Sequence, residues 1–365
     1  MDDFIKEKRR LKFESQYMFV KILSGKTLEE TLQSFIADAD ALKQGTNGII
    51  DMYFTGHNIN KAAISHFLSY NKAVYPEHIQ QDEGEWISKA SCGPLVFAVE
   101  GGYTGPLYKY DVSKMYASIM KSSNFMVPIK RGEFKQLTDD DITHPPFAMA
   151  TELGLTYNLK IDNKPNALLY GPECRMYSVT MFGDYIDQVL GWIKAGVPRA
   201  KQLYQCLWGA LSKRNKVKRC ISVNGNDEVR QLKDGATLTT RTYDVTLPDN
   251  YLMDRITPTI NGHIMVRGVD NTDMFNTPFA RLMPFIISRG RKMIGTIIKG
   301  DIDNVMRVHT DGWYMTVPWE QSSLKTSLDY PKLGIQCGDV RYEGYCDDGI
   351  VNKMHIVRGL FMFNE

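Results

Sequence analysis

Residues 109–120 read KYDVSKMYASIM and residues 305–317 read VMRVHTDGWYMTV, and these two stretches decide the expected fold. In the first, Asp111 closes a β-rich run, and a helical pattern begins soon afterwards around Tyr116. In the second, Asp311 occupies the turn of an apolar hairpin. Both stretches therefore place a carboxylate at the exposed end of strands that are otherwise buried.

Two carboxylates on adjacent strand ends can hold a pair of Mg²⁺ ions roughly 4 Å apart, an arrangement suited to in-line phosphoryl transfer. One aspartate by itself would not support this interpretation, because an aspartate in a β-turn is usually a turn former. The order of the motifs along the chain is what favours a two-metal site.

A third stretch, KQLYQCLWG at residues 201–209, is expected to be helical. Lys201, Tyr204, Gln205 and Trp208 are three or four residues apart and would share one helical face. A cation, an aromatic ring and an amide on one face suit a nucleotide, with the lysine facing the triphosphate and the ring facing base or sugar. An ordinary amphipathic helix with a lysine at its edge is the alternative.

Composition restricts the class of protein less than the motifs do. The chain has 365 residues, with 44 Lys and Arg against 42 Asp and Glu, so the formal charge of +2 neither demands nor excludes a nucleic-acid partner. The closest two of its six cysteines, Cys337 and Cys346, are nine positions apart, which predicts neither a zinc ribbon nor a disulfide scaffold. The charged N-terminus and the absence of an apolar run of about 18 residues predict an intracellular protein that is neither exported nor membrane-spanning.

The remaining pattern predicts an α+β organisation. Helical spacing dominates residues 1–93, and strands separated by glycine turns begin at residue 94. Further elements are expected as helices at 184–193, 199–211 and 279–299, a β-hairpin insertion at 215–278, and a strand-turn-strand unit at 304–317.

The ordered motifs resemble those of family B (alpha-like) DNA polymerases. Residues 111–118 are similar to the first palm motif, D-x-x-S-L-Y-P-S, and residues 201–209 to the fingers motif, K-x-x-x-N-S-x-Y-G. Residues 309–312 are similar to the second palm motif, D-T-D-S. Upstream, Gly101 and Gly102 lie in a stretch that resembles the template-binding glycine motif, and downstream Lys353 and His355 are similar to the K-x-Y primer-strand motif.

The resemblance implies a polymerase palm with an antiparallel sheet, helical fingers and a small thumb-like C-terminal part. The expected divisions are a mostly helical region at 1–93, palm at 94–195, a fingers helix at 196–214, a β-rich insertion at 215–278, palm again at 279–340 and the start of a thumb at 341–365.

The resemblance also implies a template-directed DNA polymerase that adds deoxynucleotides to a primer. Asp111 and Asp311 would hold two Mg²⁺ ions, or Mn²⁺ as a substitute, with the backbone carbonyl of Val112 as a further ligand. Tyr116 would lie beneath the incoming sugar and exclude a 2′-hydroxyl. The other implied contacts are Lys201 to the triphosphate, Gln205 and Trp208 beside the nascent base pair, Lys114 to phosphate, Lys353 to the primer, and Gly101, Gly102 and His355 to DNA.

The chain departs from the family pattern at several positions. His309 replaces the first aspartate of D-T-D-S, and Lys114 replaces a serine. These changes leave open a catalytically impaired homologue that serves as a DNA-binding or scaffolding subunit. An RNA polymerase or reverse transcriptase on a similar palm is a third reading, which Tyr116 and the fingers motif disfavour.

Two features concern the polymerase's accessory functions. Only about 90 residues precede the glycine motif, and the nearest imitation of an exonuclease D-x-E motif there, Asp38-Ala-Asp40, lies in a helical pattern, so no 3′-5′ exonuclease is expected in this chain. The insertion begins with a basic run that includes Lys216, Lys218 and Arg219, and it is expected to grip DNA or a priming protein. A solvated hairpin without function is the alternative. Expected partners are primer-template DNA, deoxynucleoside triphosphates, a priming protein, and a processivity or exonuclease subunit.

Overall fold

The computed structural model describes the greater part of the chain. The described residues are 8–13, 16–21, 27–55, 58–70, 75–91, 93–138, 141, 148–150, 166–221, 227–231, 237–241, 247–258, 264–322, 332–347, 349–352 and 356–358.

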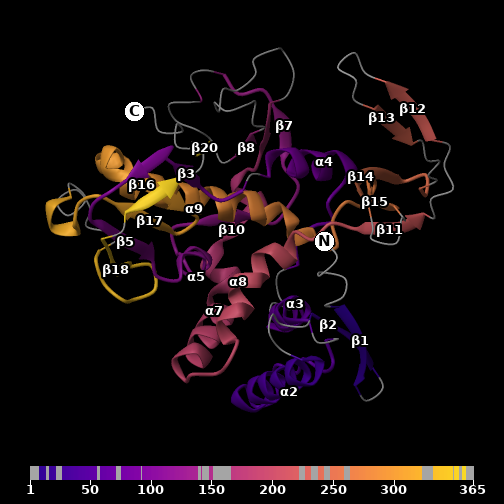
Figure 1. Ribbon diagram of the computed structural model, residues 1–365, viewed down its shortest axis with the longest axis horizontal. Coiled ribbons are helices and arrows are strands. Elements are labelled where there is room, and N and C mark those ends of the chain that lie inside the picture. The colour runs from indigo at the N-terminus through magenta and orange to yellow at the C-terminus, as the bar shows by residue number, and fades with distance from the viewer. Residues whose placement is uncertain are drawn as a thin grey trace.

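The largest sheet of the described residues has six strands with only antiparallel neighbours, lies toward the left of the view in Figure 1, and takes its strands from distant parts of the chain. Its order is β18-β5-β17-β16-β3-β20. The strands are β3 (Val96–Ala98), β5 (Leu107–Val112), β16 (Val305–His309), β17 (Gly312–Met315), β18 (Val340–Cys346) and β20 (Ile356–Arg358). In β5, Tyr110 and Val112 are buried while Asp111 between them is not, as the two-residue period of a strand requires.

A layer of helices packs against the buried side chains of this sheet. Val308 and Met315 of the sheet belong to the same core cluster as Phe182, Leu207 and Ile294 of the helices. The helices of this layer are α3 (Ile59–Tyr70), α5 (Met115–Met120), α7 (Ser178–Lys194), α8 (Ala200–Leu211) and α9 (Leu282–Ile298). Helix α8 contacts α3, α5, α7 and α9, so the third sequence motif lies on a helix with neighbours on several sides.

The N-terminal region is helical from residue 27 but begins with strands. Helix α2 (Leu28–Gly45) starts at a capping box, in which Thr27 and Glu30 each accept the other's backbone N–H. The antiparallel pair β1 (Lys8–Phe13) and β2 (Gln16–Lys21) precedes it, so this segment departs from the helical pattern, while the mostly helical region at 1–93 as a division of the chain stays a prediction. Leu11 and Phe13 are two residues apart, which is the strand period that the helical interpretation missed.

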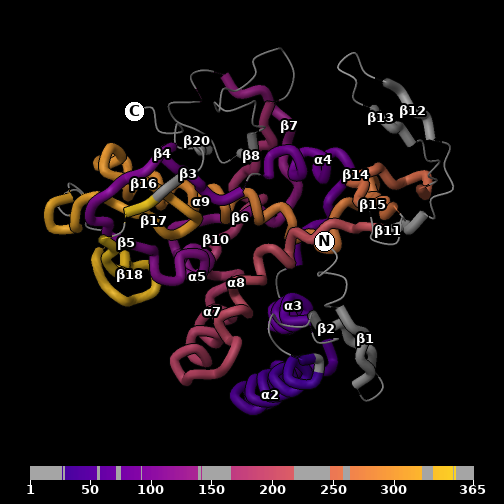
Figure 2. The backbone as a smooth tube through the Cα atoms, in the orientation of Figure 1, coloured from indigo at the N-terminus to yellow at the C-terminus, as the bar shows by residue number. Residues whose placement is uncertain are grey.

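The insertion is β-rich, as predicted. Strand β15 lies between β11 and β14 in a three-stranded sheet, and β12 pairs with β13. Their bounds are β11 (Lys216–Ile221), β12 (Asp227–Gln231), β13 (Thr237–Arg241), β14 (Tyr251–Pro258) and β15 (Ile264–Asp270). Figure 2 shows β14 and β15 at the opposite end of the molecule from β17 and β18.

The boundary that the sequence analysis draws after residue 340 falls inside a strand. Strand β18 pairs with β5 from Val340 to Cys346, and β20 pairs with β3. Residues 340–346 and 356–358 therefore belong to the six-stranded sheet, and the thumb-like C-terminal part stays a prediction. Backbone hydrogen bonding to a strand some 230 residues earlier decides this placement.

Short strands and 3₁₀ helices complete the described chain. The strands are β4 (Gly101–Tyr103), β6 (Met126–Pro128), β7 (Glu133–Lys135), β8 (Ala148–Ala150), β9 (Ala167–Leu169), β10 (Arg175–Tyr177) and β19 (Ile350–Asn352). The 3₁₀ helices are η1 (Pro172–Cys174), η2 (Pro278–Arg281), η3 (Lys299–Asn304) and η4 (Trp319–Gln321). Among the described helices, none combines the length and the apolar character needed to cross a bilayer.

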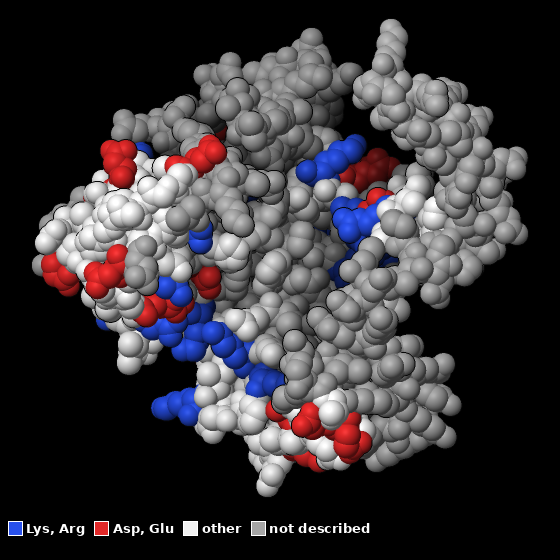
Figure 3. Space-filling model, viewed as in Figure 1, with Lys and Arg blue, Asp and Glu red and all other residues white. Residues whose placement is uncertain are grey.

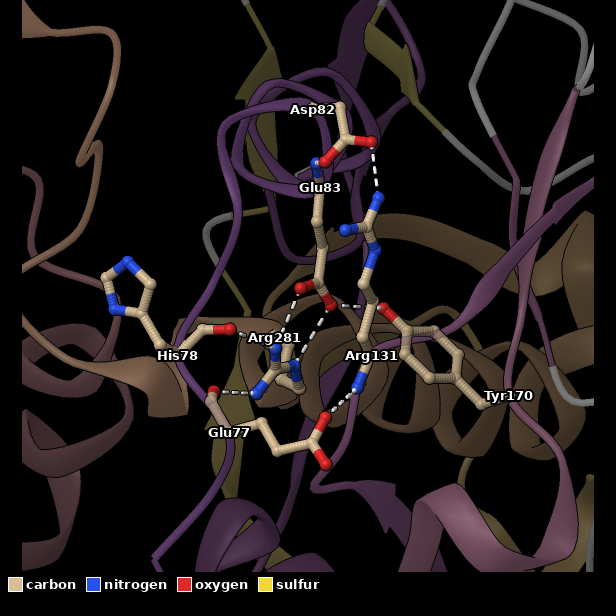
Figure 4. A network of polar contacts seen from close by, with 7 residues as sticks. All are labelled: Glu77, His78, Asp82, Glu83, Arg131, Tyr170 and Arg281. Atoms are coloured by element: carbon tan, nitrogen blue, oxygen red, sulfur yellow. Dashed lines mark hydrogen bonds and ion pairs between the residues drawn. The ribbon is translucent and has the colours of Figure 1, made fainter.

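A buried ion pair fastens helix α4 (Gln81–Ala90) to η2, directly before α9 (Figure 4). The guanidinium of Arg281 donates to both carboxylate oxygens of Glu83, at 3.0 and 2.7 Å, and both side chains are fully buried. Arg281 also donates to the carbonyl of Glu77, and the hydroxyl of Tyr170 donates to Glu83 at 3.4 Å. These additional bonds satisfy the buried charges that would otherwise destabilise the fold.

Candidate active site

The strand register places the two residues with the predicted carboxylates, Asp111 and Asp311, at the same end of strands β5 and β17. Gly312 is the direct partner of Asp111 across β17 and β5, and the N–H of Val112 donates to the carbonyl of Asp311 at 2.8 Å. The β16–β17 hairpin is fastened on its other side by a bond from the Thr310 N–H to Leu95, at 2.9 Å. Thr310 has a φ of 64°, a conformation that is rare for a β-branched residue. This tight turn places Asp311 at the tip of the hairpin.

Asp111 is already paired with a cation from the neighbouring strand. Arg341 of β18 lies opposite Asp111 in the register and donates to its two carboxylate oxygens, Nε to Oδ1 at 3.2 Å and Nη2 to Oδ2 at 3.0 Å. The same guanidinium bonds to Glu343, whose carboxylate also pairs with Lys109 at 2.7 Å. Charges of opposite sign therefore alternate across β5 and β18, in the order Asp111, Arg341, Glu343 and Lys109.

Burial raises the pKa of both aspartates above the ordinary value. For Asp111 the bonds from Arg341 oppose the effect of burial, and the charge of Glu343 adds to it. For Asp311 the backbone N–H, Lys201 and His309 oppose it. Both carboxylates thus lie in surroundings that disfavour their negative charge, and an added cation would stabilise it.

Helix α8 carries a lysine and aromatic side chains, and the charge of its Lys201 acts on Asp311. Lys201 and Gln205 are exposed on the helix, whereas Tyr204 is buried. Burial raises the pKa of Tyr204, and the charges of Cys337, Asp311 and Asp111 raise it further. Tyr204 shares the predicted helical face, but the sequence alone does not connect it with the two aspartates.

Tyr116 of α5 packs against Trp208 of α8, with ring centroids 5.2 Å apart and the planes at 31°. Tyr116 is 9% exposed, and the edge of its ring also faces Gly290 of α9. Burial, together with the charge of Asp311, raises the pKa of Tyr116 to about 12, so its hydroxyl stays protonated at neutral pH. Tyr116, the residue expected to contact the sugar, therefore packs against the helix that carries residues 201–209.

The start of α5 is shaped by a loop that sequence reasoning missed. Lys114 adopts a left-handed conformation, with φ 54° and ψ 43°, and its carbonyl accepts the N–H of Ser118. In front of it, Ser113 exchanges backbone hydrogen bonds with Asp339 and Gly338, at 2.8 and 2.7 Å. The segment before β18 therefore holds the turn between Asp111 and α5.

The glycine motif lies beside the strand that leads to the C-terminal motif. Strand β4 pairs with β19, with Gly101 opposite Asn352 and Gly102 opposite Val351. Lys353 and His355 lie outside the described residues, although Lys353 follows Asn352 directly in the chain. The backbone pairing therefore joins the glycine motif to residues 350–352, which directly precede the C-terminal motif in the chain.

The insertion residues belong to a different sheet. Lys216, Lys218 and Arg219 are on β11, which pairs with β15. The ammonium of Lys216 is 3.5 Å from the carboxylate of Asp254, while the side chains of Lys218 and Arg219 lie outside the described part.

Asp38 and Asp40, the imitation of an exonuclease motif, are on helix α2 and are both hydrogen-bonded to other side chains. Arg199 donates to Asp38 at 2.8 Å, and the Tyr53 hydroxyl donates to Asp40 at 2.7 Å. The first contact joins α2 to the N-terminal end of α8.

The carboxylates of Asp111 and Asp311, at the end of β5 and in the β16–β17 turn, are the kind of ligand that Mg²⁺ prefers. Among the residues that the structure describes, no group of three or more His, Cys, Asp or Glu side chains could hold a metal ion. Mg²⁺ does not need such a cage, because it is usually bound by one or two carboxylates together with water and substrate phosphates. The guanidinium on Asp111 shows that this carboxylate accepts a cation. Asp111 and Asp311 therefore fit the ion, with Glu343 close by.

Arg341 and Glu343 were missed by the sequence analysis. They lie in a β-rich stretch of alternating charge near the C-terminus, and their side chains meet across an irregularity in the register of β18 between Tyr342 and Gly344. Figure 3 shows Lys and Arg side chains gathered in a band over α5, α7 and α8 on the visible face, next to the acidic side chains at the sheet edge.

The fold as a whole is similar to that of known protein structures. A structure of Phi29 DNA polymerase complexed with single-stranded DNA aligns with a TM-score of 0.52 and 12% sequence identity, over 89% of this chain and 57% of the other. The fold resembles that of a DNA polymerase. The chain thus spans a little over half the length of the Phi29 enzyme. A Phi29 complex with primer-template DNA aligns with a TM-score of 0.49 and 14% identity, over 94% of this chain and 62% of the other.

No protein-family profile matches the chain, and no curated protein matches it. The likeness to the Phi29 enzyme is therefore one of fold.

Proposed function

We propose that the protein is a template-directed DNA polymerase that adds deoxynucleotides to a primer 3′ end. The observation that carries the proposal is the register of the six-stranded sheet, which sets Asp111 beside the hairpin that carries Asp311. Helix α8 contributes Lys201, whose charge acts on Asp311. A polymerase-like fold with the family B motifs in order supports the same function.

In this proposal Asp111 and Asp311 hold Mg²⁺, with the Val112 carbonyl as a further ligand and Mn²⁺ as a substitute. The ions supply positive charge where phosphoryl transfer needs it. Lys201, which is exposed on α8 and lowers the pKa of Asp311 by its charge, would bind the triphosphate. Primer-template DNA would be contacted by Gly101, Gly102 and the segment with Lys353 and His355.

The nucleotide would lie against the aromatic pair. Tyr116, packed on Trp208, would limit the space at the sugar, and Gln205 would lie beside the nascent base pair. Lys114, at the start of α5, is the further phosphate contact of the proposal.

Primer extension with Mg²⁺ tests this function directly. The Asp311→Asn variant should keep its fold and lose nucleotide addition by roughly a thousandfold or more, because loss of a metal-holding carboxylate removes several kcal/mol of transition-state stabilisation. The matched control is Asp303→Asn, which changes an exposed aspartate of η3 and should extend primers like the unmodified protein. Near-normal extension by Asp311→Asn would contradict the assignment.

A catalytically impaired homologue that binds DNA is the second candidate. His309 at the start of the hairpin motif and the cation already held by Asp111 favour it. Absence of extension by the unmodified protein, together with tight binding of primer-template DNA, would support this candidate.

A further inference from the structure

Arg341, which belongs to none of the family motifs, is paired with Asp111 and so affects how Asp111 can bind an ion. The two residues are direct partners across β18 and β5, and the guanidinium fork covers both carboxylate oxygens. A forked, charge-assisted contact of this kind is among the stronger hydrogen-bonded arrangements in proteins. The side chain of Asp111 is 18% exposed and that of Arg341 is 44% exposed, so the contact lies at the rim of the site.

A divalent ion and this guanidinium compete for the same oxygens. An ion bound by Asp111 must take at least one carboxylate oxygen that Arg341 now uses, and the two positive charges would repel each other at that distance. Arg341 has a second acceptor in Glu343, two residues further along β18. The guanidinium can therefore leave Asp111 and keep a partner.

We propose that Arg341 is a resident cation that competes with the divalent ion for Asp111 and so sets the ion affinity of the site. This inference rests on the proposed function, because it requires that Asp111 holds the ion. In the ion-free protein Arg341 neutralises Asp111, whose pKa burial and Glu343 raise. Arg341 is thus a positioning residue: it acts on the ion through Asp111.

The proposal predicts a tighter ion site when the guanidinium is removed. The pair is partly exposed, so solvent limits its strength, and the expected gain for Arg341→Gln is roughly five- to tenfold in Mn²⁺ affinity. Arg341→Lys keeps the charge but loses the fork, and its gain should be smaller. Because an ion that binds only the folded state stabilises it, Mn²⁺ should also raise the melting temperature of Arg341→Gln more than that of the unmodified protein.

The experiment titrates Mn²⁺ alone into the full chain by calorimetry, without DNA or nucleotide. The variants are Arg341→Gln, Arg341→Lys, Asp111→Asn, and the double variant of Arg341→Gln with Asp111→Asn. Arg267→Gln is the matched control, because Arg267 lies 4.0 Å from Asp254 within the insertion sheet. It should leave the Mn²⁺ affinity unchanged.

Tighter binding by Arg341→Gln that disappears in the Asp111→Asn background would support the proposal. Unchanged or weaker binding in the Arg341 variants, with binding still dependent on Asp111, would overturn it and leave the proposed function standing. Mn²⁺ binding that is unchanged in Asp111→Asn would overturn both. If Arg341→Gln shows no folding transition, Arg341→Lys, which preserves the charge, decides the outcome.

Discussion

Tyr116 is the side chain on which sugar selection should depend. It is held between Trp208 and α9, so its ring has little freedom to move away from a bulkier substrate. Replacement by alanine should raise ribonucleotide incorporation relative to deoxynucleotide incorporation by roughly tenfold or more, since one steric contact is worth about 1–3 kcal/mol of discrimination. Single-nucleotide insertion assays with matched deoxy and ribonucleotides measure this ratio.

The control for this prediction is Tyr116→Phe, which removes the hydroxyl and keeps the ring. It should retain most of the preference for deoxynucleotides if the ring excludes the 2′-hydroxyl. An unchanged ratio in Tyr116→Ala would show that Tyr116 is only a core residue beneath α8.

At the scale of elements, the attachment of α4 to η2 depends on the buried Glu83–Arg281 pair (Figure 4). Arg281→Met should lower the free energy of unfolding by roughly 3–5 kcal/mol, because it leaves the Glu83 carboxylate buried without its cation. Replacing both partners with apolar residues should be much less harmful. Urea unfolding of the three proteins measures the difference.

The exposed neighbour of this pair is a matched control. Arg131 donates to Asp82 at 2.5 Å in the same network, but both side chains face solvent. Arg131→Gln should change the free energy of unfolding by less than about 1 kcal/mol. A similar loss for Arg131→Gln and Arg281→Met would mean that burial does not govern the cost.

The packing of α3 on α7 should depend on pH through His66. Burial lowers the pKa of His66 below 6.5, while its hydrogen bond with Gln188 opposes this shift. The unfolded chain then takes up a proton at higher pH than the folded protein, so this group's contribution to stability falls as pH decreases below 6.5 towards the folded pKa. The loss is limited to about 1.4 kcal/mol per pH unit.

Urea unfolding at pH 7.5 and pH 5.5 tests this contribution. The difference between the two free energies should be smaller in His66→Gln than in the unmodified protein. His78→Gln changes an exposed histidine and should keep the full pH dependence. Identical pH dependence in all three proteins would exclude His66 as its source.

At the scale of the whole molecule, the insertion is expected to lie along bound duplex DNA. Each Lys or Arg that neutralises a phosphate should steepen the log-log salt dependence of duplex binding by roughly 0.9. Alanine at Lys216, Lys218 and Arg219 should therefore flatten that slope and impair synthesis through duplex DNA, while single-nucleotide addition at low salt survives. Lys216 already pairs with Asp254, so its own contribution to the slope should be small.

Lys299→Ala, which removes an exposed lysine of η3, is the control for a change in net charge alone. The same salt dependence in the triple variant and the unmodified protein, with intact strand displacement, would show that the basic run is a solvated face.

The elements around the candidate site were predictable from sequence because their signals are local. The strands before Asp111 and around Asp311, the helix at 200–211 and the β-rich insertion each show their period within a few residues. The order of the motifs also carried the polymerase resemblance, and the fold agrees with it. The N-terminal hairpin was missed because short apolar runs fit strand and helix periods alike.

Only the tertiary structure decided which side chains meet. Asp111 lies opposite both Gly312 and Arg341, although these residues are some 200 or more positions away along the chain. Strand register over such separations depends on packing and backbone hydrogen bonding across the whole sheet, and a shift by one residue would turn every side chain to the other face. The sequence by itself therefore determined the local elements, the candidate carboxylates and the helical face with Tyr204, and tertiary packing added Arg341 and Glu343.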